Sequence, residues 1–314
     1  MAASPSSTSR VGAIDIGTNT IALLVAHLDP SGRRIVDSDR TTVTRLGKSV
    51  DGTRRLAPDA MARSLACLKE YAEILERYQV SRVDAVGTSA LRDADNATEF
   101  LDSAEALIGV RPRVIDGSEE ALLTCRGALD ELAVAGPFVV FDIGGGSTEF
   151  VVGEATPRGS SLQHFASLDI GCVRLTERHL ASDPPTVQEM TALREDVRAA
   201  LNELPFDVTQ GTLVGVAGTM TTLCAVHLGL SPYDPRRVHG ARLSRSALDA
   251  EQSRLSQLTA GSRRHLPGLG AARSDIIVAG AVIATEVLEK CHRNEVVVSD
   301  HGVRYGLSSM LLEP

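Results

Sequence analysis

Residues 139–152 read Val-Val-Phe-Asp-Ile-Gly-Gly-Gly-Ser-Thr-Glu-Phe-Val-Val, and this stretch decides the fold. Its β-branched and aromatic ends predict two strands, and its three glycines predict the turn that joins them. Glycine allows positive φ and lets a ligand approach the backbone N–H groups closely. Asp142 ends the first strand and Glu149 begins the second, so two carboxylates flank these amides. The combination suits a phosphate that carries a metal ion.

A second copy of this pattern lies near the N-terminus. Residues 13–20 read Ala-Ile-Asp-Ile-Gly-Thr-Asn-Thr, and an apolar run follows at 21–26. Both copies contain a strand, Asp-Ile-Gly, a small polar turn and a second strand. Because each copy opens one half of the chain, we expect a duplicated domain in which each half presents a phosphate turn to a shared cleft.

These paired turns resemble the two phosphate loops of the actin/Hsp70/sugar-kinase superfamily. Residues 142–149 resemble more narrowly the Ppx/GppA phosphatases, which are exopolyphosphatases and guanosine pentaphosphate phosphohydrolases. Three further segments match that family in the same order: 87–96, 117–121 and 299–306. The resemblance spans nearly the whole chain. It implies an α/β fold of two duplicated actin-like (ribonuclease H-like) domains, with mixed sheets and the active-site cleft between them.

The length and composition agree with such a protein. A chain of 314 residues favours two domains, and 43% hydrophobic with 23% charged residues is typical of a globular protein. We expect a disordered tail at 1–10, an N-terminal domain at 11–134 and a C-terminal domain at 135–314. The break at Gly136-Pro137 sets this boundary. The last helix is expected to pack back on the first domain.

The net charge and the cysteines restrict the classes of binding partner and the cellular location that we expect. A net charge of −8 disfavours nucleic acid, and no apolar run is long enough to span a membrane. Five scattered cysteines without metal-ligand spacing predict buried thiols in a cytoplasmic protein. A homodimer is implied by the resemblance alone.

Three charged side chains are the candidate catalytic residues: Glu120, Arg92 and Glu149, of which Glu149 would act as a metal ligand. Glu120 matches the family's catalytic glutamate, which would orient or deprotonate the attacking water. From the residues alone, stabilisation of a helix dipole by Glu119 and Glu120 is the favoured interpretation. Arg92 would either bind a phosphate oxygen or pair with a neighbouring aspartate, and the resemblance favours the phosphate.

The resemblance also implies the ion and the phosphate contacts. The ion would be Mg²⁺ or Mn²⁺, with K⁺ as a further candidate, and Asp142, Glu149 and Asp15 would hold the divalent ion. For Gly218 and Thr219, tight helix–strand packing is the alternative to an anion site. The predicted phosphate-binding residues are Gly17, Thr18, Asn19, Thr20, Ser89, Gly144, Gly145, Gly146, Ser147, Thr148, Gly218 and Thr219.

Several other segments lie outside the predicted catalytic and phosphate-binding residues. Asp169-Ile170-Gly171 repeats the motif but precedes a helical pattern, so it is predicted to be a structural turn. Segments 33–36 and 41–43 are predicted to be separate strands. The pairs Arg236-Arg237 and Arg263-Arg264 are either solvated faces or a track for polyphosphate.

The predicted reaction is hydrolysis of the terminal phosphoanhydride of inorganic polyphosphate. Short chains are expected, because the sequence stops after the two-domain core. Removal of a phosphate from guanosine pentaphosphate (pppGpp) is the alternative, since its chemistry is the same. A sugar or acetate kinase and an actin- or Hsp70-like nucleotide switch are the remaining alternatives.

Overall fold

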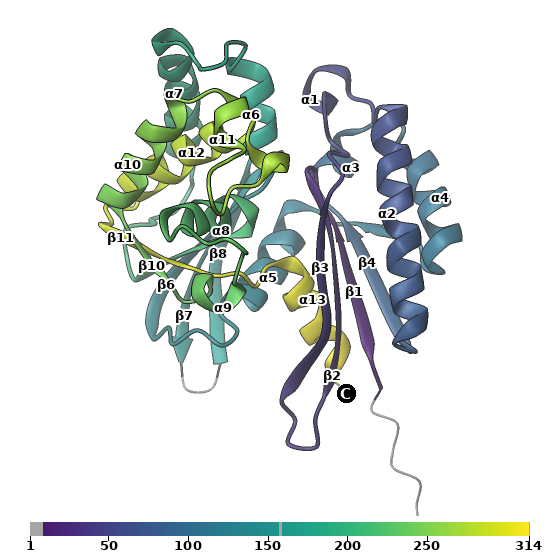
Figure 1. Cartoon of the computed structure of the whole chain (residues 1–314). Helices are drawn as coiled ribbons and strands as arrows, with labels where there is room; N and C mark the ends of the chain where they lie inside the picture. The colour runs from purple at the N-terminus through teal and green to yellow at the C-terminus, as the bar shows by residue number, and fades with distance from the viewer. Residues whose placement is uncertain (1–8, 157–158, 314) are drawn as a thin grey trace, which may run out of the picture. The chain divides into compact units, whose positions relative to one another are not determined.

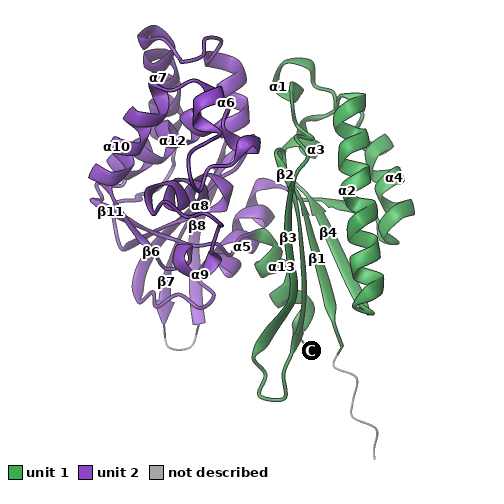
Figure 2. Ribbon diagram, viewed as in Figure 1, with its two compact units in different colours: residues 1–115, 303–314 green, residues 116–302 purple. Residues whose placement is uncertain are grey.

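The computed structural model describes residues 9–156 and 159–313, which form two compact units (Figure 2). Unit 1 comprises the chain up to Ile115 together with the segment from Val303 onward, and unit 2 comprises Asp116–Gly302. The division falls at Asp116, earlier than Gly136-Pro137, because helix α5 (Gly117–Ala128) packs on unit 2 strands. Most of the predicted tail lies outside the described residues.

Unit 1 is built on a five-stranded mixed sheet with the order β3-β2-β1-β4-β5. Strand β1 pairs antiparallel with β2 and parallel with β4. The strands are β1 Val11–Ile16, β2 Thr20–Leu28, β3 Arg34–Val43, β4 Arg82–Gly87 and β5 Arg113–Val114. The segments predicted as two strands at 33–36 and 41–43 are thus one strand, because β3 continues through polar residues at the sheet edge.

Helices cover both faces of the unit 1 sheet (Figure 1). Helices α2 and α4 pack on one face around Ile14, Ile16 and Leu23. Helix α13 contacts β1, β2 and β4 on the other face, where Arg304 donates two hydrogen bonds to Asp39, at 2.8 and 3.0 Å. The helices are α1 Val50–Thr53, α2 Pro58–Arg77, α3 Ser89–Asp93, α4 Ala97–Ile108 and α13 Val303–Leu312.

Unit 2 repeats this plan in a six-stranded sheet with the order β10-β11-β9-β6-β7-β8. Strand β6 pairs antiparallel with β7 and parallel with β9, as β1 does with β2 and β4. The strands are β6 Gly136–Ile143, β7 Thr148–Thr156, β8 Gly159–Leu168, β9 Thr212–Val216, β10 Arg242–Ser244 and β11 Glu295–Val298. The predicted duplication of an α/β domain with a mixed sheet is confirmed.

The unit 2 core has two layers of helices. Helix α5 covers Val140, Val151 and Val214 on one face, and the larger core containing Phe141 and Phe150 lies on the other. Apart from α5, the helices are α6 Cys172–His179, α7 Val187–Asn202, α8 Ala217–His227, α9 Pro235–Val238, α10 Arg245–Ser256, α11 Ala260–Arg263 and α12 Ile277–Lys290. Helix α6 begins at Cys172, which confirms that Asp169-Ile170-Gly171 is a structural turn.

Two expectations about side chains can be compared with this fold. All five cysteines are buried and free, as predicted. Arg263 belongs to neither a solvated face nor a surface track, because it is 3% exposed and bonds to Asp183 and to the carbonyl oxygen of Ser274.

Across the described residues, no helix combines the length and apolarity needed to cross a membrane.

Candidate active site

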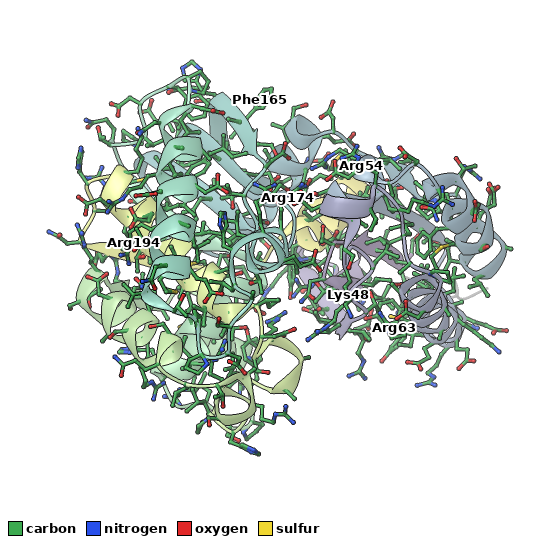
Figure 3. All side chains as sticks on the ribbon, turned by 90° about the horizontal axis from the view of Figure 1, so that it is seen from above. Lys48, Arg54, Arg63, Phe165, Arg174 and Arg194 are labelled. Carbon is green, nitrogen blue, oxygen red and sulfur yellow. The ribbon has the colours of Figure 1, made fainter. Side chains whose placement is uncertain are left out.

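The glycine turn of unit 2 is tied from behind by the start of helix α6. The amide of Cys172 donates to the carbonyl oxygen of Gly144 at 3.0 Å, and the amides of Val173 and Arg174 donate to that of Gly145 at 2.9 and 3.1 Å. The Nε of Arg174, labelled in Figure 3, donates to the carbonyl oxygen of Gly146 at 2.6 Å. Three consecutive carbonyl groups therefore point toward α6.

This anchoring fixes the direction of the N–H groups in the same turn. A trans peptide is planar, with its carbonyl oxygen and its N–H on opposite sides. Because the carbonyls of residues 144–146 face α6, the N–H groups of residues 145–147 face away from it. Successive N–H groups on one side form an anion-binding concavity. The turn thus has the backbone arrangement that a phosphate requires.

The turn of unit 1 is anchored in the same way by the segment that follows β3. The Gly47 amide donates to the carbonyl oxygen of Thr18 at 2.8 Å, and the amides of Thr44 and Arg45 donate to that of Asn19 at 3.1 and 3.0 Å. Both turns are closed by a bond between their first and fourth residues, from Gly17 to Thr20 at 2.9 Å and from Gly144 to Ser147 at 3.0 Å. The two predicted phosphate turns therefore share one backbone design.

Beside the unit 2 turn, three polar side chains stand in a row across adjacent strands. Asp142 on β6 lies opposite Glu149 on β7, which lies opposite Ser167 on β8. We call Asp142, Glu149 and Ser167 the cross-strand row. Within it, the Ser167 hydroxyl donates to Glu149 Oε1 at 2.7 Å. The strand register alone therefore brings two carboxylates to the end of the sheet that carries the glycine turn.

Helix α5 lies over this row and supplies a third carboxylate. Its start is fixed by Asp116, whose side chain accepts from the amides of Ser118 and Glu119 at 2.9 Å each. Glu120 follows in the first turn and is 8% exposed. One turn later the Thr124 hydroxyl donates to Asp142 Oδ2 at 3.2 Å. Residues 120 and 124 are four apart, so both side chains lie on one face of the helix.

The carboxyl groups of Glu120, Asp142 and Glu149 lie close together, so each disfavours ionisation of the others. Burial and, to a lesser extent, the charge of the neighbouring Glu120 together raise the pKa of Asp142 to about 7, against a hydrogen bond from Thr124 that lowers it. Burial also raises the pKa of Glu149 well above its usual range, as do the charges of Glu120 and Asp142. Hydrogen bonds from Ser147 and Ser167 lower it in part. A proton or a cation is needed to hold this cluster together.

The donor set fits a hard divalent cation that arrives with water or substrate. Carboxylate oxygens suit Mg²⁺, which takes one or two of them and completes its shell with water and phosphate oxygens. Within residues 9–156 and 159–313, no three His, Cys, Asp or Glu side chains are arranged to hold a metal by themselves. Asp142 and Glu149 thus fit as a partial Mg²⁺ site, and the ligand role of Asp15 in unit 1 stays a prediction.

Two other predicted site residues of unit 1 lie at helix α3, together with Asp93, the alternative partner of Arg92. Arg92 donates to the carbonyl oxygen of Ile115 at 3.0 Å. Asp93 lies 3.4 Å from the guanidinium of Arg54. Ser89 is buried at the start of α3. The predicted phosphate contact of Arg92 remains a prediction.

In unit 2, Gly218 and Thr219 make the contacts of tight packing. The Thr219 hydroxyl donates to the carbonyl oxygen of Ile143 at 3.0 Å, and Arg273 donates to that of Gly218 at 3.0 Å. A Cβ on Gly218 would lie 2.5 Å from the Arg273 guanidinium. The Thr148 hydroxyl likewise bonds the carbonyl oxygen of Ile170, at 2.6 Å. These contacts position the turn, and phosphate binding by the same residues stays a prediction.

The duplicated sheets, each with an anchored Asp-Ile-Gly turn, define an α/β protein of the actin-like class. The model of the Ppx/GppA phosphatase family matches residues 24–313, so the chain belongs to that family.

Individual relatives agree with this assignment. Exopolyphosphatase 2 of Mycobacterium tuberculosis (strain ATCC 25618 / H37Rv) is 42% identical, over 96% of this chain and 98% of that protein. The guanosine-5'-triphosphate,3'-diphosphate pyrophosphatase of Vibrio atlanticus (strain LGP32) is 29% identical, over 96% of this chain and 59% of that protein. The crystal structure of the Aquifex aeolicus Ppx/GppA family member superimposes with a TM-score of 0.81 at 33% identity, covering 97% of this chain and 98% of that one.

Proposed function

We propose that this protein is an exopolyphosphatase, which releases orthophosphate from the end of inorganic polyphosphate. The observation that carries the proposal is the buried cluster of Glu120, Asp142 and Glu149 beside the N–H groups of residues 145–147. Amides can hold an anion and carboxylates can hold a cation or take a proton, so one end of the unit 2 sheet carries what phosphoanhydride hydrolysis needs.

In the proposed reaction, a water oxygen attacks the terminal phosphorus and the bond to the bridging oxygen breaks. The N–H groups of residues 145–147 bind non-bridging oxygens of the terminal phosphate. Glu120 accepts the proton of the attacking water, and the shortened chain keeps the bridging oxygen. A divalent ion held by Asp142 and Glu149 would neutralise charge on the leaving phosphate. The predicted roles of Arg92 and of the turn at 17–20 in binding phosphate rest on family resemblance.

A guanosine pentaphosphate phosphohydrolase is the second candidate. The Vibrio atlanticus relative is named for that reaction, in which the same type of bond breaks. The chain is 29% identical to that relative, against 42% to Exopolyphosphatase 2. This difference favours polyphosphate. A cytoplasmic location, dependence on Mg²⁺ or Mn²⁺, and a homodimer belong to the same proposal.

The test is phosphate release from short polyphosphate, long polyphosphate, pppGpp and ATP, measured side by side with Mg²⁺. Wild type is compared with Glu120→Gln and with Glu119→Gln, a matched control in the next position of the same helix turn. We expect release from polyphosphate, a loss of about a hundred- to ten-thousandfold in Glu120→Gln, and a small change in Glu119→Gln. Release from pppGpp alone would establish the second candidate, and no release from any substrate would exclude both.

A further inference from the structure

Ser167, which carries no assigned role, makes a short hydrogen bond to a carboxylate of the cluster. Its hydroxyl lies 2.7 Å from Glu149 Oε1, whereas Thr124 lies 3.2 Å from Asp142 Oδ2. Glu149 is 2% exposed. A buried carboxylate with few partners is costly, so a hydroxyl donor there decides where its oxygens rest.

The position of Ser167 is in turn fixed by the first residue of helix α5. A Cβ on Gly117 would lie 2.6 Å from the Cβ of Ser167 and 3.1 Å from its Oγ. Only glycine allows the helix to approach the strand this closely without moving Ser167. The same helix turn carries Glu120. Ser167 therefore touches both Glu149 and the start of the helix that brings Glu120.

We propose that Ser167 is a positioning residue: it holds the Glu149 carboxylate in register with Glu120 through its contact with Gly117. This inference rests on the proposed function, because it explains how the carboxylates of Glu149 and Glu120 are aligned in the proposed active site. Ser167 itself does not touch the reacting atoms. Its hydroxyl keeps Glu149 Oε1 at one place on the row while the backbone of Gly117 sets the distance of α5 from β8.

The experiment compares Ser167→Ala with Ser161→Ala, an exposed serine on the same strand. Partners of this kind typically contribute about ten- to hundredfold in activity or ion affinity. We expect kcat on polyphosphate to fall by that factor in Ser167→Ala while KM for polyphosphate stays within about twofold, and the Mg²⁺ concentration for half-maximal rate to rise. Ser161→Ala should match wild type in all three.

Two further variants separate positioning from a merely structural role. Ser167→Thr keeps the hydroxyl and should recover most of the lost kcat. Gly117→Ala keeps the serine but displaces it, and should reproduce the loss of kcat. The melting temperature of Ser167→Ala is expected to remain close to wild type, since Ser167 is exposed. A loss explained by a lower melting temperature would contradict the positioning role.

The outcomes also separate this inference from the proposed function. An active wild type with an unchanged Ser167→Ala overturns the role of Ser167 and leaves the exopolyphosphatase proposal intact. A wild type that releases phosphate from no substrate overturns the proposed function and, with it, this inference.

Discussion

The two anchored turns differ in what lies next to them, although their backbones match. In unit 1 the row across β1, β2 and β3 reads Asp15, Ala22 and Thr41. In unit 2 the row across β6, β7 and β8 reads Asp142, Glu149 and Ser167. Duplication thus preserved the amide turn and one aspartate in both units, whereas the second carboxylate of the row occurs in unit 2 alone. Backbone geometry and charge are separable features of this site.

The largest effect is expected from removing Glu149, the carboxylate that unit 2 has and unit 1 lacks. Glu149→Gln should lower kcat/KM on polyphosphate by about a thousandfold, or ~4 kcal/mol, because it removes one acid of the cluster and a predicted metal ligand. Glu154→Gln, exposed on the same strand, is the control and should change kcat/KM little. Activity of Glu149→Gln within about threefold of wild type would remove Glu149 from the mechanism.

The reverse substitution asks whether unit 1 tolerates the same charge. Ala22 is 5% exposed, and Ala22→Glu places a carboxylate there opposite Asp15. We expect the free energy of unfolding to fall by about 3 kcal/mol, from burial of the charge and from overpacking. Urea unfolding measures this, with Ala22→Ser as the small polar control. Equal stability of the two variants would mean that unit 1 can also accommodate an acid.

Gly171 in unit 2 and Gly47 in unit 1 pack against the two turns, and the two glycines differ in the atoms that they contact. A Cβ on Gly171 would lie 2.4 Å from the backbone oxygen of Gly145, whereas one on Gly47 would lie 2.4 Å from the side-chain Cγ2 of Thr18. Gly171→Ala should therefore cost about 2 kcal/mol of stability, and Gly47→Ala less.

A second-site change tests this explanation. Thr18→Ser removes the methyl group that Gly47→Ala meets, so the double variant should recover stability in urea unfolding. The Cβ of Ala90 at 2.9 Å and the Cβ of residue 18 at 3.2 Å limit the recovery. No gain from Thr18→Ser would show that the contact with Thr18 does not set the cost.

The smallest expected effect is a change in the pH dependence of stability. The raised pKa values of Asp142 and Glu149 mean that the folded protein binds more protons than the unfolded chain between about pH 4 and 7. In EDTA, this cluster should therefore make stability fall as pH rises through that window. Glu149→Gln should reduce the fall, and the difference between the two urea-unfolding series isolates the cluster. If the free energy of unfolding changed with pH equally in wild type and in Glu149→Gln, that result would contradict the raised pKa of Glu149.

Local patterns predicted the parts of the molecule that local chemistry determines. The strands around both Asp-Ile-Gly turns, the duplication and the structural turn at Asp169-Ile170-Gly171 follow from glycine and apolar runs. The sequence predicts two strands where the structure has the single strand β3, since an edge strand with Asp37, Asp39 and Arg40 lacks an apolar pattern. The sequence leaves Arg263 on either a solvated face or a polyphosphate track, and neither is right because Arg263 is buried against Asp183, which lies 80 residues away in the sequence.

The site was predictable where a motif carries it and hidden where strand register creates it. Glu120, Asp142 and Glu149 stand in recognisable segments. Ser167 and Arg174 do not: each acts through a contact with another element, one with Glu149 on β7 and one with Gly146 in the glycine turn. The repeated Asp-Ile-Gly at 169–171 indicates that residues 167–174 matter to the fold. The sequence alone does not show that Ser167 contacts Glu149 or that Arg174 contacts Gly146.

Helix α13 has a consequence for the order in which the protein can be made. Unit 2 is one continuous segment, whereas unit 1 takes its last helix from residues 303–312, after unit 2 has been synthesised. Domains tend to fold as units while the chain emerges from the ribosome. The sheet that is made first must therefore wait for the helix that covers its second face, with β1, β2 and β4 bare on that face, until the ribosome has passed residue 312. Nascent unit 1 therefore exposes an uncovered sheet face that favours aggregation until α13 has been made.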